Sequence, residues 1–584
     1  MGTISDKLMR IINTKEDIRQ ALISKGYDVP TSIPFKEYAK MILDLPCKVD
    51  SFPDIEGIVA RYSASGLTNE QMAANPVWVD KTGNGHDLQM KNFACGGMSG
   101  VGGYEMNFNL WTNNVPSIPD ISMSTTTTSV SVSVGNSTYN NNLIYIHMNN
   151  WDINKNHWLK VTSTYEDGDL VFKFYNDNNS KNIELPANGY VNIPAYPEFK
   201  GNYMYISTTS NKQGSFTIEQ LPLYPGALVF DGVDDCGTCD NFPILTKEKG
   251  YTVVALRQWD QDFLNTTLTG GLLSTRNYST GEGVAFEKIE SSNKGYWNLG
   301  AGGIIDFAKS PFTWQTSKQY NNVGILKGDK NHGKPLCVGC GLSGGQQCGR
   351  FAIWELVFLD HDATEEELTK IKDYFVKTYP WLFPDQAWTV TGKTNEDEDR
   401  ATIANITGNG NDLVLSNFGF AEGSGYNEEG EYAGYLVTDG VDDKIISSIF
   451  KMGNDWTVIG DWELINTGKN DNAGIVKFDS IVIYNYNYNY NSMLINIKNG
   501  RNILIPDQNT VNAICSDGRI YSKDWKESIY NEETESTSKN FLTIGYSGNT
   551  YTKIAFKNLA IYPTVLSRED CIKAYNYLQT LKAK

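Results

Sequence analysis

The chain has 584 residues and a formal net charge of −18 at pH 7. This length is sufficient for several domains, each with its own core. The negative charge and the lack of any Lys/Arg cluster in the sequence argue against a nucleic-acid partner, because DNA and RNA binding depends on basic contacts to phosphate. No apolar run is long enough to cross a bilayer, so membrane insertion is not expected.

Two helices are predicted at the N-terminal end, over residues 4–25 and 35–45. The apolar side chains of the first helix recur at helical spacing and form a stripe that needs a partner. The stripe includes Leu8, Ile11, Ile12, Ile18 and Leu22. Two alternatives stay open: the helices pack on the following domain, or they dock onto a larger assembly or a second copy.

The first ten residues are polar and lead into an amphipathic pattern, which does not match a secretory signal peptide. Met1-Gly2 also lacks a myristoylation pattern, because Asp6 stands where Ser or Thr is expected. The sequence therefore predicts that the protein is made, and first folds, in a reducing cytosol.

One order of motifs occurs twice along the chain. Asp-Gly-Val-Asp-Asp at 231–235 returns at 439–443, and a Thr-Gly-Asn-Gly segment precedes each copy, at 82–88 and 407–413. An apolar strand follows each copy. Self-similarity of this kind predicts two copies of one domain.

Each copy is predicted to close with a strand, over 351–358 and 554–561, followed by an amphipathic helix. The helices begin with capping-box patterns that start at Thr364 and Ser567. Their predicted apolar faces are Leu368, Ile371 and Phe375 in the first helix, and Cys571, Ala574 and Leu578 in the second.

The Asp-Gly-Val-Asp-Asp segments follow predicted strands. A strand that runs into Asp-Gly predicts a turn, because Gly accepts positive φ and the Asp carboxylate can bond the following backbone amides. Clustered carboxylates are also the ligands that calcium prefers, but the spacing matches no EF-hand loop. The turn is the favoured interpretation, and a calcium loop is the alternative.

The copies differ by an insertion at residues 104–225 of the first copy. Alternating and β-branched runs between Asn, Gly and Asp turns predict a small β-sandwich there. We expect such an insertion where the ends of a loop lie close together. The predicted domains are a helical segment at 1–50, a first jelly roll at 51–103 plus 226–384, the insert at 104–225, and a second jelly roll at 385–584.

Four of the nine cysteines form two Cys-x-x-Cys pairs, which can provide a tetrahedral zinc site. They are Cys236, Cys239, Cys337 and Cys340, with Cys348 nearby. The second copy has Thr543 and Tyr546 in place of the last pair, so the fold does not require these cysteines. Small apolar residues on strands are the favoured interpretation, zinc is the alternative, and no cofactor is expected.

A run of alternating tyrosines lies in the second copy, at Tyr484, Tyr486, Tyr488 and Tyr490. In an extended segment they share one side and form an aromatic surface that can stack on sugar rings. The favoured interpretation is a low-complexity hairpin between 481–483 and 494–497, which leaves these tyrosines as weak ligand-binding candidates.

Motifs that carry enzyme chemistry are missing from the sequence. It has no His-Glu-x-x-His pattern, no nucleophile elbow and no phosphate-binding loop. The acidic run at 395–399 is interpreted as a solvated loop. The protein is therefore not expected to be an enzyme, and no catalytic residue is predicted.

The segment 228–235 followed by the strand 251–256 resembles concanavalin A-like, laminin-G-type jelly rolls. The resemblance implies a mainly β protein with two such sandwiches, the first carrying an inserted small β-sandwich, behind a short helical segment. Modules of this type commonly bind glycans or proteins.

The segments 4–8 and 13–22 resemble the start of virion proteins from tailed phages of gut Bacteroidales, including crAss-like phages. This resemblance implies a head or tail fibre or appendage protein, anchored to the particle by its N-terminal helices. Its implied partners are capsid or tail proteins, further copies of itself in a dimer or trimer, and host surface polysaccharide. A glycan depolymerase and a secreted-type bacterial carbohydrate-binding protein are the alternatives.

Overall fold

The computed structural model describes Lys15 and residues 52–583 with gaps. The gaps are 114–120, 136–145, 149–150, 154–156, 177–178, 194–195, 197–198, 200–202, 209–212, 246–248, 276–284, 289–293, 298–303, 307–310, 317–335, 343–345, 431, 449, 451, 466–473, 479–480, 487–491, 498–500, 506–510, 523–524, 530–541 and 548–549. By its contacts the chain divides into Met1–Asp54 and Ile55–Lys584.

In the first unit, Lys15 lies in a helix. The remainder of the helices predicted at 4–25 and 35–45, with the apolar stripe from Leu8 to Leu22, falls outside the described residues. Among the described residues, no helix combines the length and the apolar character needed to span a membrane.

The first repeat is built from two largely antiparallel sheets. One sheet has the order β22 (Phe312–Thr316), β17 (Thr252–Trp259), β26 (Arg350–Leu359), β15 (Leu228–Asp231) and β4 (Gly100–Val101), and β1 (Ile58–Ser63) also pairs with β26. The other has the order β2 (Val77–Trp78), β3 (Leu88–Lys91), β16 (Cys236–Cys239), β23 (Leu336–Val338), β18 (Gly270–Ser274), β19 (Ala285–Lys288), β20 (Lys294–Trp297) and β21 (Ile304–Asp306). In addition, β25 (Gln346–Cys348) pairs with β18 and with β24 (Cys340–Leu342).

Short helices accompany these sheets: α3 (Asn69–Ala74), α4 (Gln261–Leu264), α5 (Glu365–Thr378) and η4 (Pro380–Leu382). Alternate residues of the strands point between the sheets and form one apolar core, which includes Trp78, Trp259 and Phe358. This packing of two sheets over a shared core is a β-sandwich.

The second repeat has the same strand order. Its first sheet is β30 (Gly425–Tyr426), β31 (Leu436–Val437), β44 (Ile554–Tyr562), β33 (Thr457–Leu464), β38 (Val511–Cys515), β39 (Arg519–Ser522) and β40 (Glu527–Ile529), and β27 (Gln386–Thr389) pairs with β44. Its second sheet is β28 (Thr402–Ile403), β29 (Leu413–Ser416), β32 (Lys444–Ser447), β41 (Thr543–Ile544), β34 (Gly474–Phe478), β35 (Ile481–Tyr486), β36 (Ser492–Ile497) and β37 (Arg501–Ile505). A hairpin of β42 (Tyr546–Ser547) and β43 (Thr550–Tyr551) follows β41, and the chain ends in helix α6 (Arg568–Gln579).

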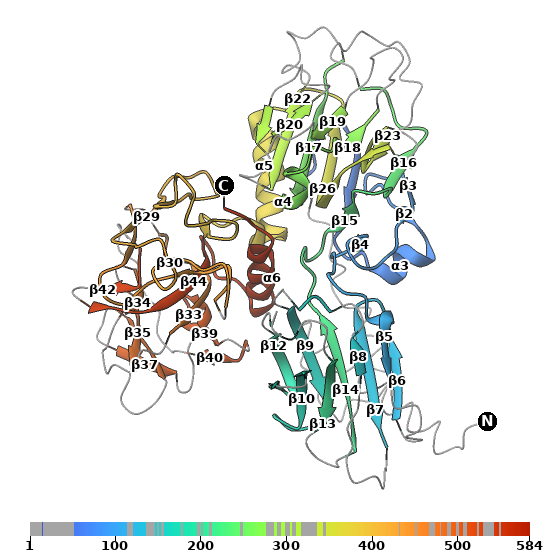
Figure 1. Cartoon of the computed structure of the whole chain (residues 1–584). Helices are drawn as coiled ribbons and strands as arrows, with labels where there is room; N and C mark the ends of the chain where they lie inside the picture. Colours follow the sequence, from blue (N-terminus) through green and yellow to red (C-terminus); the bar gives the residue numbers. More distant parts are fainter. Residues whose placement is uncertain are drawn as a thin grey trace. The chain divides into compact units, whose positions relative to one another are not determined.

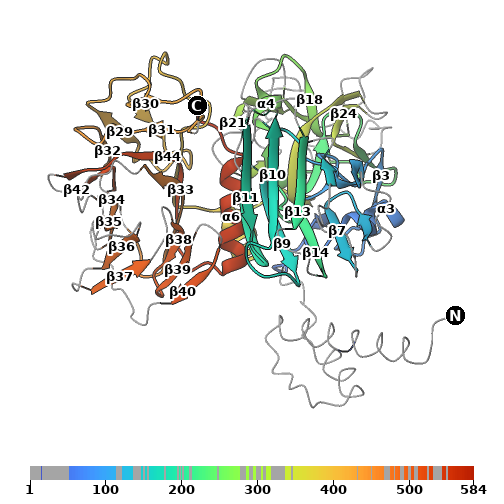
Figure 2. The same cartoon turned by 60° about the horizontal axis from the view of Figure 1, so that its bottom comes forward.

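The insert has its own core and its own sheets, which Figure 2 shows beside the first repeat. A five-stranded sheet has the order β12 (Asn188–Ile193), β9 (His157–Ser163), β14 (Gly214–Gln220), β7 (Ser129–Val134) and β6 (Ile121–Thr125). A three-stranded sheet has the order β11 (Asn179–Leu185), β10 (Leu170–Asn176) and β13 (Tyr203–Thr208). The helix η1 (Phe108–Leu110) leads into β5 (Trp111–Asn113), which pairs with β8 (Ile146–Met148).

The two ends of the insert lie next to each other. The Leu223 N–H donates to the Gly103 carbonyl at 2.9 Å, and the Tyr224 N–H donates to the Gly102 carbonyl at 2.8 Å. At the matching place in the second repeat a short loop closes, with the Asn427 N–H donating to the Tyr435 carbonyl at 2.9 Å. A loop whose ends are already bonded together can accept a domain without disturbing the sheets.

The predicted mainly β fold with sandwich domains is confirmed by these sheets (Figure 1). Outside the insert, whose strands are β5 to β14, the two repeats match strand for strand from β1 to β26 and from β27 to β44, apart from the additional strands β39 and β40. The insert stands between β4 and β15, which are the counterparts of β30 and β31.

Candidate functional site

Helix α6 of the second repeat is buried on most of its surface. The Ser567 hydroxyl accepts a hydrogen bond from the Asp570 N–H at 3.1 Å and so begins the helix. The buried side chains are Cys571, Ile572, Ala574, Tyr575, Asn576, Tyr577 and Leu578. A helix on the outside of a sandwich needs only one buried face. The second buried face shows that α6 packs against more than its own repeat.

Tyr575 and Tyr577 both contact other modules from α6. The Tyr577 hydroxyl donates to Gln258 Oε1 at 3.2 Å, and its ring lies edge-on to Trp354 of the first repeat. The Tyr575 ring lies edge-on to Trp158 of the insert, with centroids 5.1 Å apart. Burial raises the pKa of both tyrosines, so both hydroxyls stay protonated.

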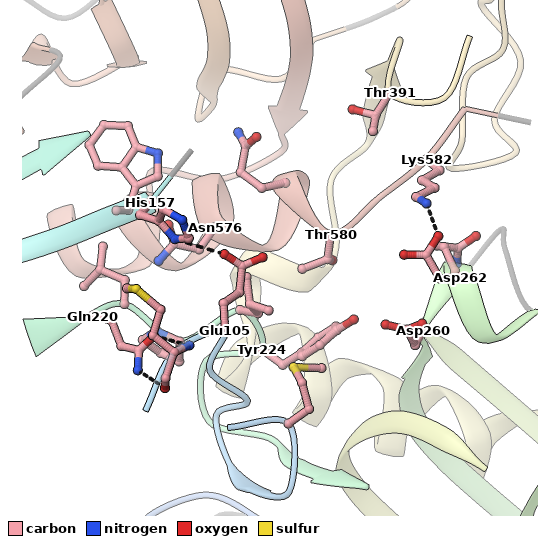
Figure 3. Close-up of a pocket in the computed structure, with 18 of the residues that line it drawn as sticks. Glu105, His157, Gln220, Tyr224, Asp260, Asp262, Thr391, Asn576, Thr580 and Lys582 are labelled. Atoms are coloured by element: carbon pink, nitrogen blue, oxygen red, sulfur yellow. Dashed lines mark hydrogen bonds and ion pairs between the residues drawn. The ribbon is translucent and has the colours of Figure 1, made fainter. Parts of the chain in front are cut away.

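A cavity of about 530 Å³ lies where α6, the first repeat and the insert meet (Figure 3). The insert contributes Glu105, His157 and Trp158, and the first repeat contributes the start of α4 and of β26. The second repeat contributes β44 and the last turn of α6. Most of the residues that line the cavity are charged or polar.

Acidic groups and basic groups pair around this cavity. His157 Nδ1 lies 3.3 Å from Glu105 Oε2, and Arg350 Nε lies 3.5 Å from Asp260 Oδ2. Asp262 forms an ion pair with Lys582 at the rim (Figure 3). Each carboxylate that lines the cavity therefore has a basic neighbour, a state suited to hydrogen bonding a polar ligand.

Local contacts fix several of these side chains in place. His157 Nε2 lies 2.7 Å from the Asp152 carbonyl oxygen, which orients the ring toward Glu105. The Gln220 side-chain amide accepts from the Met106 N–H at 3.1 Å and donates to the Met106 carbonyl at 2.6 Å. This two-point contact ties together the segments that enter and leave the insert.

The two Asp-Gly-Val-Asp-Asp segments are turns with the same hydrogen bonds. In the first, Asp235 accepts from the Asp231 N–H at 2.9 Å and from the Ser99 hydroxyl at 2.9 Å. In the second, Asp443 accepts from the Asp439 N–H at 2.7 Å and from the Ser424 hydroxyl at 3.1 Å. The carboxylates thus stabilise backbone that the turn leaves without ladder partners.

Each turn also gathers three carboxylates within 4.8 Å of one another. They are Asp231, Asp234 and Asp235 in the first repeat, and Asp439, Asp442 and Asp443 in the second. Burial raises the pKa of Asp235 to about 7 and that of Asp443 to about 6. These values reflect carboxyl groups enclosed beside other acids.

The cysteines that the structure brings together are not the predicted set. Cys236, Cys337, Cys340 and Cys348 form one buried cluster, in which Cys340 and Cys348 form a disulfide. Cys239 instead belongs to the main core, and its thiol donates to Asn241 Oδ1 at 3.0 Å. Cys236 and Cys239 lie in the same strand, β16, and residues three apart in a strand point to opposite faces. A hydrogen bond with the Cys337 thiol lowers the pKa of Cys236 to about 7.

The alternating tyrosines belong to a hairpin. Tyr484 and Tyr486 lie in β35 and pair with Leu494 and Ser492 of β36. Tyr488 and Tyr490 lie outside the described residues. The cavity at α6 does not include these tyrosines.

The sequence does contain a signal for the second buried face of α6, although the predicted apolar face omits it. When the two helices are aligned from their N-caps, Thr369, Lys372 and Asp373 of α5 correspond to Ile572, Tyr575 and Asn576 of α6. The three residues of α5 are exposed, whereas those of α6 are buried. Comparison of the two copies would have identified a contact face in the second.

No protein-family model matches the chain, and no curated protein matches its sequence. Among solved structures, the chain is similar to Trypanosoma rangeli sialidase in complex with sialic acid, with 9% sequence identity and a TM-score of 0.23. The match covers 81% of this chain and 86% of the sialidase chain. A second similar structure is domain 4 of an extracellular arabinanase from Geobacillus stearothermophilus in complex with arabinotriose, with 11% sequence identity and a TM-score of 0.21. The match covers 33% of this chain and 100% of the arabinanase domain.

The receptor-binding domain of botulinum neurotoxin type G is 14% identical, covers 33% of this chain and 50% of its own, and has a TM-score of 0.20. Similarities of this size carry no argument about activity or ligand. The fold therefore stands on the strand orders of this chain alone.

Proposed function

We propose that the protein is a non-enzymatic glycan-binding component of a phage virion, which attaches to the particle through its N-terminal helices and binds host surface polysaccharide. The observation that carries the binding part is the polar cavity of about 530 Å³ where α6, the first repeat and the insert meet. A volume of this size accommodates a ligand of a few sugar rings.

The groups around the cavity suit a hydroxyl-rich ligand. Carboxylates and a guanidinium group provide charge-assisted hydrogen bonds to hydroxyl groups, and side-chain amides provide neutral ones. Trp158 provides a ring that can stack on the apolar face of a sugar. Charges of both signs are present, so the chemistry fits neutral or mildly acidic glycans better than a strongly charged polymer.

Binding is favoured over hydrolysis by the ion pairs of the lining. A glycoside hydrolase needs one carboxyl group that holds a proton and a second that acts as base or nucleophile. Here Glu105, Asp260 and Asp262 are each engaged by a basic side chain, namely His157, Arg350 and Lys582 in turn. Depolymerisation is the second candidate, because three carboxylates do share one cavity.

A binding experiment with rim variants tests the proposed site. The full chain is titrated with polysaccharide purified from the host surface, and the double variant Asp262→Asn, Lys582→Ala is compared with it. We expect about tenfold weaker binding, because two charged hydrogen-bonding groups are lost. The matched control is Glu366→Gln, Lys370→Ala, which removes an exposed ion pair of α5 away from the cavity.

Three outcomes separate the alternatives. Weaker binding in the rim variant alone supports the site, and equal binding by both variants places glycan binding elsewhere on the protein. Release of oligosaccharides from the same polysaccharide by the unmodified chain would replace binding with depolymerisation.

The virion part of the proposal is supported by the resemblance of residues 4–8 and 13–22 to virion proteins of tailed phages. Deletion of residues 1–46 tests it, because the described β-domains begin after them. We expect the truncated protein to bind polysaccharide as the full chain does but to be missing from assembled particles. Normal incorporation of the truncated protein would contradict anchoring by this segment without affecting the proposed glycan site.

A further inference from the structure

Four cysteine side chains meet inside the first repeat. Cys236 comes from β16, Cys337 from β23, Cys340 from β24 and Cys348 from β25, and each is at most 5% exposed. They form a cluster of cysteines that is separate from the apolar core of the sandwich. Cysteines that serve only as small apolar residues would be expected within that core.

The chain around the cluster is shaped to bring the sulfurs together. Cys337 and Cys340 flank Gly339, which has φ of +99°. A Cβ on Gly339 would lie 2.6 Å from the Asp235 carbonyl oxygen, so this turn requires glycine. The close approach puts Cys340 Sγ within 3.4 Å of the same carbonyl oxygen, directly before Cys236 in the chain.

The remaining pairs complete a four-sulfur arrangement. Cys340 and Cys348 face each other across β24 and β25, with their Cα atoms 4.0 Å apart. Cys236 and Cys337 share a thiol hydrogen bond between the neighbouring strands β16 and β23. Four sulfurs on adjacent strands, joined by a Cys-x-x-Cys turn, are the donor set of a closed structural zinc site.

We propose that Cys236, Cys337, Cys340 and Cys348 form a tetrahedral Zn²⁺ site that fills when the Cys340–Cys348 disulfide is reduced. Two molecules of a low-molecular-weight thiol supply the two electrons and two protons that convert this disulfide into two thiols before the strands enclose it, and they are themselves oxidised to one disulfide. Zn²⁺ then binds the four sulfurs as thiolates, and four protons are released.

Burial favours a structural metal over redox signalling. Redox-sensing cysteines are exposed enough to meet an oxidant, whereas these four are enclosed. A Zn²⁺ ion with four thiolates carries a charge of about −2, and Lys91, opposite Cys236 in the ladder, provides a nearby cation. A closed site with no open coordination position holds strands together and does not catalyse.

The second repeat makes a different cross-strand contact at the same four positions. The pairing registers place Lys444, Thr543, Tyr546 and Tyr551 where the first repeat has its cysteines. There the Lys444 ammonium lies 5.7 Å from the centre of the Tyr551 ring. This place in the fold thus joins neighbouring strands in both repeats, by a cation–π contact in one and by sulfur in the other.

Metal analysis of the full chain tests the proposal. The chain is produced in a reducing cytosol, purified without chelators and measured for zinc by mass spectrometry. We expect about one zinc per chain and loss of most of it in Cys337→Ser and in Cys348→Ser. Cys239→Ser is the matched control, because Cys239 is a buried cysteine of β16 outside the cluster, and it should keep its zinc.

A second measurement covers variants that fail to fold. The unmodified chain is reduced, stripped of metal and titrated with Co²⁺, which should produce the intense visible absorption of a tetrahedral thiolate site with one ion per chain. Two results would overturn the proposal. One is a metal-free chain that gives no such spectrum, and the other is zinc that survives Cys348→Ser but not Cys239→Ser.

Discussion

The two repeats share a framework and differ in what they place on it. Their strand orders agree, and the carboxylate that closes each Asp-Gly-Val-Asp-Asp turn has the same two partners. The repeats differ in side chains that take no part in the backbone hydrogen bonds of the sheets. The first repeat buries Arg61 and Glu355 on the paired strands β1 and β26. At the corresponding positions of β27 and β44, the second repeat has Ala387 and Asn558.

This contrast shows which interactions define the fold and which adapt it. The turn is required in both repeats, because without it the strand cannot change sheets at this point. Among the described residues, the Arg61–Glu355 ion pair, the second buried face of α6 and the cysteine cluster each belong to one repeat, so the sandwich forms without them. We therefore expect these features to contribute to the stability of one repeat or to the contacts between modules.

Replacing Glu355 should have the largest effect. Arg61 Nε lies 3.2 Å from Glu355 Oε2, and the Tyr379 hydroxyl donates to Glu355 Oε1 at 2.8 Å. In Glu355→Gln the buried guanidinium loses its counter-charge, and we expect a loss of about 3–5 kcal/mol in the free energy of unfolding of the first repeat. Urea unfolding followed by tryptophan fluorescence measures it.

The second repeat supplies the control for this experiment. The double variant Arg61→Ala, Glu355→Asn introduces the pair found there and leaves no charge buried. We expect it to be clearly more stable than Glu355→Gln, since removing both partners of a buried pair costs less than removing one. Equal destabilisation in the two variants would mean that packing volume, and not charge, determines the loss.

Truncating Tyr575 should come next. Its ring contacts Trp158 of the insert and Trp525 of its own repeat. We expect Tyr575→Ala to cost about 3 kcal/mol and to speed amide hydrogen exchange in β9, which carries Trp158. Lys372→Ala, at the same position of the exposed α5, should stay within about 0.5 kcal/mol. Similar effects of the two variants would contradict the assignment of α6 as the contact between modules.

The pH dependence of the second repeat tests the turn itself. Burial raises the pKa of Asp443 to about 6, above its ordinary value. The folded chain therefore holds a proton that the unfolded chain releases, and the associated stability, present at low pH, is lost as pH rises through 6. The effect should be on the order of 1 kcal/mol.

Melting temperatures between acidic and neutral pH measure this dependence. Asp443→Asn should remove this loss from the profile over that window, and Glu428→Gln, which replaces an exposed acid outside the turn, should leave the profile unchanged. An Asp443→Asn profile with the same slope as that of the unmodified chain would contradict the raised pKa.

Much of the fold follows from local signals in the sequence. The repeated turns, the closing strands and the insert can be recognised because each depends on residues close together in the chain, such as Gly232 after Asp231. The strand at Leu228–Asp231 and its counterpart follow the expected apolar pattern.

The candidate site could not be predicted in the same way. The cavity combines Glu105, Asp260 and Lys582, which come from three modules, and only tertiary packing brings them together. The cysteine set was wrong for a partly local reason, because Cys239 shares a motif with Cys236 in sequence but points to the opposite side of the strand. Cys348 takes its place in the cluster, because β25 pairs with β24.

The two repeats can also be compared in the hydrogen bonds that cap the N-termini of α5 and α6. Both helices carry a capping-box pattern, but only α5 completes it: Thr364 Oγ1 accepts from the Glu367 N–H at 3.3 Å, and the Glu367 carboxylate accepts from the Thr364 N–H at 2.8 Å. In α6 the shorter Asp570 side chain accepts from the Ser567 hydroxyl instead, at 2.7 Å. Glutamate has the extra methylene that the return bond needs.

Thr364→Ala and Ser567→Ala should therefore cost similar amounts, about 1 kcal/mol each, because each removes the side chain that caps a helix. Glu367→Ala should cost about 0.5–1 kcal/mol, whereas Asp570→Ala should stay within about 0.5 kcal/mol, since it caps no backbone amide in α6. Denaturant midpoints of the four variants measure these differences. An Asp570→Ala loss as large as that of Glu367→Ala would show that the acid acts through its charge near the helix N-terminus, and not through the hydrogen bond that its length forbids.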